Sequence, residues 1–302
     1  MLPNDNKKSA VICPNCRKLI NASNQTCPYC GIIKPVQRQK IMRVFGNSGI
    51  NFVKVIITIN VILFILSYLL PYLLPELKVR HSKGLLGFIP SPSNVSLYLL
   101  GWADPRQILA GKWWLLISAT FLHGGIFHIL FNMMWVKDLA PATEKLFNPY
   151  KMIVIYLFGG IGGNIAAIFF PLIMNSLFSL NMAMMPVIGA SGAVFALMGS
   201  IIAFGKKTGG FYGQHLVRQL GVWAVIMIGM GFLIPGISNT AHIGGFISGF
   251  VIGYLIPDKN KAKYDLFFII LSLALCLLTI FTYLMILINI IDVKTNLMNV
   301  LN

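Results

Sequence analysis

Two polar residues in an otherwise apolar chain could together hydrolyse a peptide bond. Ser191 lies in a Gly-Ala-Ser-Gly stretch, and His242 lies in an Ala-His-Ile-Gly-Gly stretch. A serine hydroxyl is a poor nucleophile until a base takes its proton. Imidazole can accept that proton near neutral pH and return it to the leaving amine. The pair therefore suggests nucleophilic catalysis, with Ser191 as nucleophile and His242 as general base.

The glycines around Ser191 suit such a role. Gly189 and Gly192 would let the backbone turn sharply at a helix entrance and let another group approach closely. A helix N-terminus leaves unpaired backbone N–H groups, which could hold a developing oxyanion. Taken alone, however, this stretch is better explained as a small residue at a helix–helix contact.

The sequence after His242 provides a reason for the two residues to meet. Positions 242, 245, 249 and 253 share one helix face, which is a histidine followed by Gly245 and two further glycines. Positions 192, 196 and 199 form a matching small-residue face after Ser191. A lone intramembrane histidine could equally be satisfied by a backbone carbonyl. With the serine helix as partner, we expect the two faces to pack and catalysis to be the better explanation.

Further polar groups lie on an earlier apolar segment. His128 and Asn132 are four residues apart and share a helix face. Both carry N–H donors that could stabilise an oxyanion, although interhelical hydrogen bonding alone would also explain them. His123 is expected to be structural or interfacial. No Asp or Glu falls in the outer half of a predicted span, so we expect a Ser–His dyad whose histidine is oriented by packing.

These residues must be positioned by a membrane-embedded scaffold. The 302-residue chain is 57% hydrophobic, 11% charged and has a mean hydropathy of +0.77, whereas soluble chains are about 45–50% apolar and 25% charged. The net charge of +16 could suggest nucleic acid. We exclude that partner because the Lys and Arg residues lie mostly between apolar runs and in the N-terminal segment, where they set topology on anionic lipid. The first forty residues are polar, so no cleavable signal peptide is expected.

Seven apolar stretches are long enough to span a bilayer as helices. An orientation with a cytosolic N-terminus places 18 of the 24 Lys and Arg residues inside, which the positive-inside rule favours. The polar residues described above then share one depth near the outer face. We predict a multi-pass plasma-membrane protein whose site opens outward, with spans at 52–74, 117–137, 151–174, 189–205, 219–235, 240–257 and 265–291.

Residues 1–40 predict a separate cytosolic module, followed by a linker at 41–50. The four cysteines Cys13, Cys16, Cys27 and Cys30 form two CxxC pairs separated by ten residues. Two such pairs can complete a tetrahedral Zn²⁺ site, and a cytosolic location argues against disulfides. We predict a structural zinc ribbon, since so short a region has too little core to fold alone. It could bind a cytosolic partner, and its basic residues could touch lipid head groups, although a solvated face explains them more simply.

These motifs together resemble the rhomboid family. Its marks are Gly-x-Ser-Gly, Ala-His with following glycines, and His-x₃-Asn, which match the stretches around Ser191, His242 and His128. The resemblance implies an all-α core of six transmembrane helices at 51–260. It also implies cleavage of transmembrane substrates without a catalytic cofactor, and makes 261–302 a seventh helix with a short external tail. Two positions depart from the family pattern: Leu115 replaces an arginine in the first loop, and Phe195 replaces a tyrosine on which the histidine stacks.

Two other function classes remain at this point. An inactive rhomboid-like protein could bind transmembrane clients without cleaving them, although such proteins usually lack the serine or the histidine. A seven-helix transporter would need polar groups along a continuous path, and here they cluster at one depth.

Overall fold

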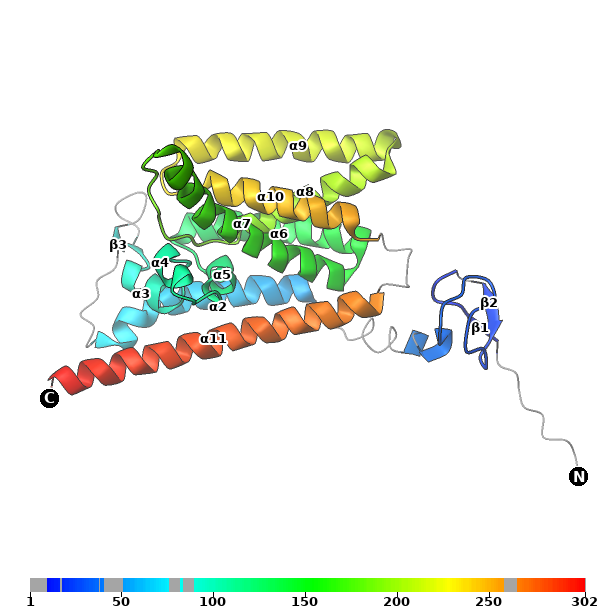
Figure 1. Ribbon diagram of the computed structural model, residues 1–302, viewed down its shortest axis with the longest axis horizontal. Helices are drawn as coiled ribbons and strands as arrows, with labels where there is room; N and C mark the ends of the chain where they lie inside the picture. Colours follow the sequence, from blue (N-terminus) through cyan, green and yellow to red (C-terminus); the bar gives the residue numbers. More distant parts are fainter. Residues whose placement is uncertain are drawn as a thin grey trace, which may run out of the picture.

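The computed structural model describes residues 10–16, 18–37, 39–40, 51–75, 82–83, 90–257 and 265–301. A bundle of long helices forms most of the protein, and a small two-stranded ribbon precedes it (Figure 1). The predicted linker at 41–50 and the predicted boundary near residue 260 lie outside the described residues. The long helices are α2 (Phe52–Leu73), α6 (Ile126–Phe147), α7 (Pro149–Phe178), α8 (Ser191–Thr208), α9 (Gly210–Leu233), α10 (Asn239–Leu255) and α11 (Asp265–Leu301).

The helices confirm an all-α, multi-pass membrane protein. By length and composition, four helices in the described part of the chain could cross a membrane: α2, α7, α9 and α11. A fifth span is possible where two helical pieces, 115–121 and 126–147, meet at an angle of 93°. The sequence predicted a span at 117–137, and this bend was not foreseen.

The two remaining predicted spans, at 189–205 and 240–257, correspond to α8 and α10. These helices have 18 and 17 residues and do not pass the same test of length and apolar character. In α8, Lys206 and Lys207 of the last turn lower the apolar character of the helix. Most of its length is buried by α10, α7, α9 and α6. A helix covered by other helices need not match the apolar character of lipid.

The long connection between α2 and α6 contains short elements. These are β3 (Ser82–Lys83), β4 (Pro90–Ser91), α3 (Asn94–Leu99), α4 (Pro105–Leu109), α5 (Leu115–Ser118) and the 3₁₀ helix η2 (Ala119–Phe121). Leu115 is only 3% exposed and packs with Ala103, Ile108 and Ala119. At this position, where the family pattern has an arginine, the chain therefore has an apolar contact inside the protein.

The last helix is held to the core at its start and near its middle. Asp265, at the start of α11, forms an ion pair with the fully buried Lys151 of α7 at 2.9 Å and accepts a hydrogen bond from Asn148 at 3.1 Å. Further along α11, the Tyr283 hydroxyl donates to the Ser118 carbonyl at 3.4 Å. Figure 1 shows α11, in orange and red, along the outside of the bundle.

Candidate active site and metal centre

The contact between α8 and α10 is built from small residues. A Cβ atom added to Gly245 would overlap the backbone of Gly192, and one added to Gly249 would overlap Ala196. One turn further on, a Cβ on Gly253 would lie 2.6 Å from the Ser200 Cα. The structure thus brings together the two faces that the sequence paired, and Gly199 also lies against the backbone of α10, near Phe246. Contacts this close place the first turns of both helices, with Ser191 and His242, side by side.

His242 is held by stacking. Its ring lies parallel to that of Phe195, with centroids 4.3 Å apart and planes 17° apart, and only 6% of His242 is exposed. Phe195 lies one turn after Ser191 on α8, so the phenyl ring keeps the imidazole against the serine helix. The Nδ1 atom of His242 has no hydrogen-bond partner among the described residues. Packing rather than a carboxylate therefore orients the ring.

The Ser191 hydroxyl and the His242 ring do not form a hydrogen bond in the described structure. Ser191 is partly exposed, whereas Phe195 beside it is fully buried. Catalytic hydrogen bonds are often long before substrate binds and shorten in the complex. Ser191 and His242 are therefore neighbours that lack the hydrogen bond through which catalysis would move the serine proton.

The segment entering Ser191 is fixed by the connection before α6. Ala103 and Val187 exchange two backbone hydrogen bonds of 3.0 Å, and the Gly189 N–H donates to the Ala119 carbonyl at 2.9 Å. Sequence reasoning missed these contacts, because a single bridged pair within an irregular connection leaves no periodic signal. They set where α8 begins and hence where Ser191 lies.

Gly189 lies close to His128 and near Ser191. Its φ of +125° favours glycine. A Cβ built there would lie 2.8 Å from His128 Nε2 and 3.8 Å from Ser191 Oγ. A side chain at position 189 would therefore collide with the His128 ring.

His128 directs its Nε2 toward Gly189 and the start of α8. Its Nδ1 accepts a hydrogen bond from the Gly124 N–H at 3.3 Å, so in the neutral ring the proton is on Nε2. Asn132 donates one amide N–H to the His128 carbonyl at 2.8 Å within α6. An amide has a second N–H, but the first is committed to the helix. His128 is therefore better placed than Asn132 to donate a hydrogen bond to an oxyanion.

His123 lies in the bend before α6 and is fully buried. Its ring makes an edge contact with that of His128, with centroids 5.0 Å apart, and neither of its nitrogens has a hydrogen-bond partner in the described structure. Nearby, the Asn164 amide of α7 donates to the Leu116 carbonyl at 2.8 Å. These contacts stabilise the bend and so help to orient His128.

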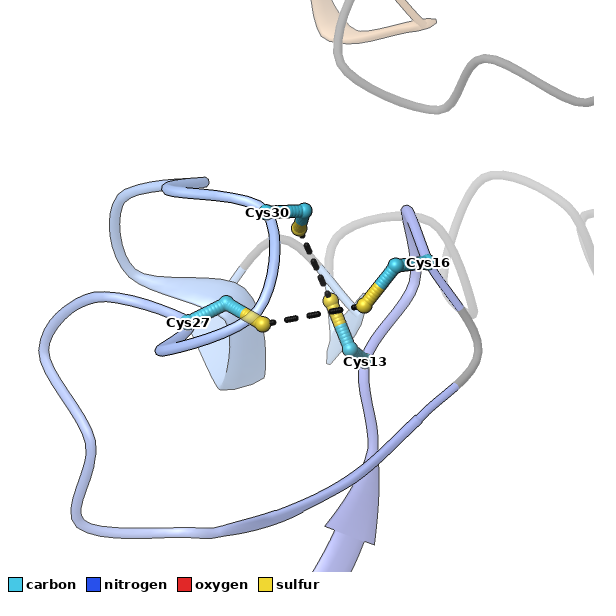
Figure 2. A group of neighbouring side chains, drawn as sticks. All are labelled: Cys13, Cys16, Cys27 and Cys30. Carbon is cyan, nitrogen blue, oxygen red and sulfur yellow. Dashed lines mark hydrogen bonds between the residues drawn. The ribbon is translucent and has the colours of Figure 1, made fainter.

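The N-terminal ribbon holds the four cysteines of the two CxxC pairs. Its strands are β1 (Ala10–Ile12) and β2 (Leu19–Asn21). Cys13 and Cys30 have sulfurs 3.7 Å apart, as do Cys16 and Cys27, and all four sulfurs lie within 4.8 Å of one another (Figure 2). A disulfide requires about 2.05 Å, so the cysteines are free, which rules out disulfides here.

The cysteine geometry fits a metal ion. Sulfurs placed tetrahedrally at about 2.3 Å from zinc are separated by roughly 3.8 Å, close to the two observed distances. The side chain of Asn15 lowers the pKa of Cys30 to about 6, whereas burial raises the pKa of Cys13 to about 12. A bound divalent cation would hold all four as thiolates. The four-cysteine cluster can therefore hold a metal.

The geometry described above agrees with comparisons to known proteins. The rhomboid domain family matches residues 110–259, the region that contains the bend, α6 to α10 and the candidate active site. This chain contains a rhomboid domain. The match leaves the cysteine ribbon, α2 and α11 outside the domain.

Several curated rhomboid proteins are similar in sequence. RHOMBOID-like protein 4 of Arabidopsis thaliana is 31% identical over 167 residues, which are 55% of this chain and 40% of that protein. Rhomboid protease GluP of Bacillus subtilis is 30% identical over 160 residues, 53% of this chain and 29% of that protein. Putative rhomboid protease YdcA of Bacillus subtilis is 29% identical over 154 residues, 51% of this chain and 72% of that protein.

The chain spans less than half of the length of the first two of these relatives. The names of the two Bacillus subtilis relatives, a rhomboid protease and a putative one, support a serine protease at the level of the family. That this chain shares the activity of these relatives is therefore a proposal.

Proposed function

We propose that this rhomboid protein is an intramembrane serine endopeptidase that uses Ser191 and His242 as a catalytic dyad. The observation that carries the proposal is the close contact of α8 and α10, with His242 stacked at 4.3 Å on Phe195, one turn from Ser191. The substrates would be transmembrane helices of other proteins in the same bilayer.

In the proposed reaction, the Ser191 oxygen forms a bond to the scissile carbonyl carbon while His242 accepts the hydroxyl proton. The negative charge on the substrate oxygen is stabilised by the Ser191 backbone N–H at the start of α8 and by the Nε2–H of His128. The intermediate then expels the amine, which receives the proton from His242, and leaves an acyl-enzyme. Water, deprotonated by His242, hydrolyses that ester and restores the serine. Asn132 could contribute its second N–H to the same oxygen.

A second candidate is a rhomboid protein that binds transmembrane clients without cleaving them. It is favoured by one observation: no hydrogen bond joins Ser191 and His242 among the described residues. The protease remains the better supported function, because Ser191, His242 and the stacked ring are all present, and a dyad can close when substrate binds.

A fluorophosphonate probe separates these candidates. In bilayer-reconstituted protein, we expect covalent labelling of the wild type, since an activated serine attacks the phosphorus. We expect no labelling of Ser191→Ala and strongly reduced labelling of His242→Ala, as measured by intact-mass spectrometry. A wild-type protein that stays unlabelled under these conditions would support client binding instead.

We further propose that the ion in the cysteine cluster is Zn²⁺ with a structural role. Four thiolates in a tetrahedral arrangement are typical of zinc, and classical zinc modules are unfolded without their metal. The proposed topology keeps the ribbon in the cytosol, where thiols stay reduced, and opens the active site toward the outer face of the plasma membrane.

Removing the metal is expected to unfold the ribbon and leave the helices intact. Purified protein should contain about one zinc per chain, as measured by elemental analysis. Cys13→Ser should lower this content at least tenfold and make residues 10–40 susceptible to protease, because too little core remains to hold them. Cys276→Ser, a change of the fifth cysteine in α11, is the matched control and should retain the zinc. Full zinc content in Cys13→Ser would contradict the four-cysteine site.

A further inference from the structure

The outward face of the ribbon is apolar where a small soluble module would present polar groups. Ile12 and Leu19 are directly opposite each other across β1 and β2, and they are 54% and 63% exposed. Side chains directly opposite in a two-stranded sheet lie on the same face. The other face carries Ile20, which packs with the cysteines. The exposed pair is therefore not part of the ribbon's core.

The exposed surface continues toward the second cysteine pair, where Asn21 and Asn24 add polar groups to it. Leu19 lines a groove of about 320 Å³ together with Tyr29, which is 58% exposed. The Lys18 ammonium lies 4.7 Å from the centre of the Tyr29 ring. We call the surface formed by Ile12, Leu19, Tyr29 and Lys18 the ribbon face. Tyr and Lys combine apolar bodies with polar tips, a combination suited to the boundary between water and lipid.

The charged side chains of the ribbon are all basic. Residues 6–75 contain no Asp or Glu, and five Lys or Arg residues fall between positions 10 and 40: Arg17, Lys18, Lys34, Arg38 and Lys40. A zinc ion with four thiolates carries a net charge of −2, so the loaded ribbon keeps a net charge of about +3. Such a surface is attracted to anionic head groups within a Debye length of about 8–10 Å.

The chain itself keeps the ribbon near a bilayer. Residues 41–50 connect it to α2, which is apolar enough to span a membrane. Ten residues reach at most roughly 33–36 Å even when fully extended. The effective concentration of lipid around the ribbon is therefore high, and weak contacts are enough to dock it.

We propose that the ribbon face docks on the anionic lipid surface of the membrane that holds the chain. Ile12, Leu19 and Tyr29 enter the head-group region, and Lys18 with the other basic residues binds phosphate groups. The ribbon then lies on the bilayer instead of extending into solution. This inference depends on membrane insertion and not on the activity of Ser191.

Photocrosslinking in the full-length, zinc-loaded protein tests the docking. A photoreactive benzoylphenylalanine replaces Leu19 in one sample and Gln25, an exposed residue outside the ribbon face, in the control. Both proteins are placed in nanodiscs of phosphatidylcholine with or without phosphatidylglycerol, and adducts are identified by mass spectrometry. Zinc content shows that each variant keeps its fold.

We expect lipid adducts at position 19, several-fold fewer at position 25, and a clear decrease when phosphatidylglycerol is left out. Adding Lys18→Gln to the Leu19 probe should lower the yield roughly fivefold, the effect of one basic residue near an anionic surface. Equal yields at positions 19 and 25 would overturn the proposal. Adducts at position 19 with protein instead of lipid would also overturn it, and would assign the ribbon face to a protein partner.

Discussion

Ser191→Ala is expected to abolish cleavage of a transmembrane substrate in reconstituted bilayers, a loss of roughly 10⁴-fold or more. His242→Ala should cause a loss of similar size, because neither group can complete the reaction without the other. For the same reason, the double variant should be no slower than either single variant. The measurement is the initial rate of product formation on a quantitative gel. This non-additivity distinguishes a dyad from two residues that contribute independently.

Ser200→Ala is the matched control for the serine. Ser200 lies on the same helix, is fully buried, and donates its hydroxyl proton to the Leu197 carbonyl of its own turn. Removing it should change stability by about 1 kcal/mol and leave the cleavage rate within a few-fold of wild type. If the Ser191→Ala protein cleaved as fast as the Ser200→Ala protein, Ser191 would not be the nucleophile.

Gly245→Ala is expected to disrupt the active site from outside it. The new methyl group would overlap the carbonyl of Gly192, so α10 must move away from α8. Overpacking of this kind costs typically 1–3 kcal/mol, partly offset by the higher helix propensity of alanine. His242 lies one turn before Gly245, and a displacement of about 1 Å at a reacting group can lower the rate roughly 100-fold. Thermal unfolding in detergent and the cleavage rate measure the two effects.

Gly221→Ala provides the comparison, because no atom lies within 4 Å of a Cβ placed at this position of α9. The same change there should be neutral or stabilising by up to about 1 kcal/mol. Equal stability and equal activity of the two alanine variants would mean that the α8–α10 contact does not position His242.

The sequence predicted α2, α7 and α10 well because apolar composition is a local property, but α9 begins nine residues before the predicted span and α11 continues ten residues beyond it, where a tail was expected. The boundaries of α2, α7 and α10 agree with the predicted spans to within a few residues. The small-residue faces at Gly192 and Gly245 could also be predicted from the sequence, since a spacing of three and four residues defines a helix face without knowledge of the fold.

The features that were missed depend on contacts between distant residues. The bend before α6 arises where the chain leaves η2, and it is supported by the hydrogen bond from Asn164 on α7. The bridge between Ala103 and Val187 involves two irregular segments with no repeating pattern. His123 could be assigned only a general structural role, because its contact with His128 depends on that bend. Each of these contacts becomes visible only when the fold is known.

The ion pair of α7 and α11 has a consequence for synthesis of the protein. Asp265, which forms the ion pair with Lys151, comes 117 positions after Asn148. Lys151 lies within one turn of Asn148, so its partner is almost as far away in the sequence. A ribosome therefore completes α7, with its lysine, long before the carboxylate that neutralises it exists. A buried ammonium without its counter-ion is costly, so Lys151 must stay hydrated at the bilayer surface until α11 arrives. Assembly of the bundle is thus completed only after the last helix has been translated, and a chain truncated before Asp265 would expose a positive charge that the quality-control machinery of the membrane could detect.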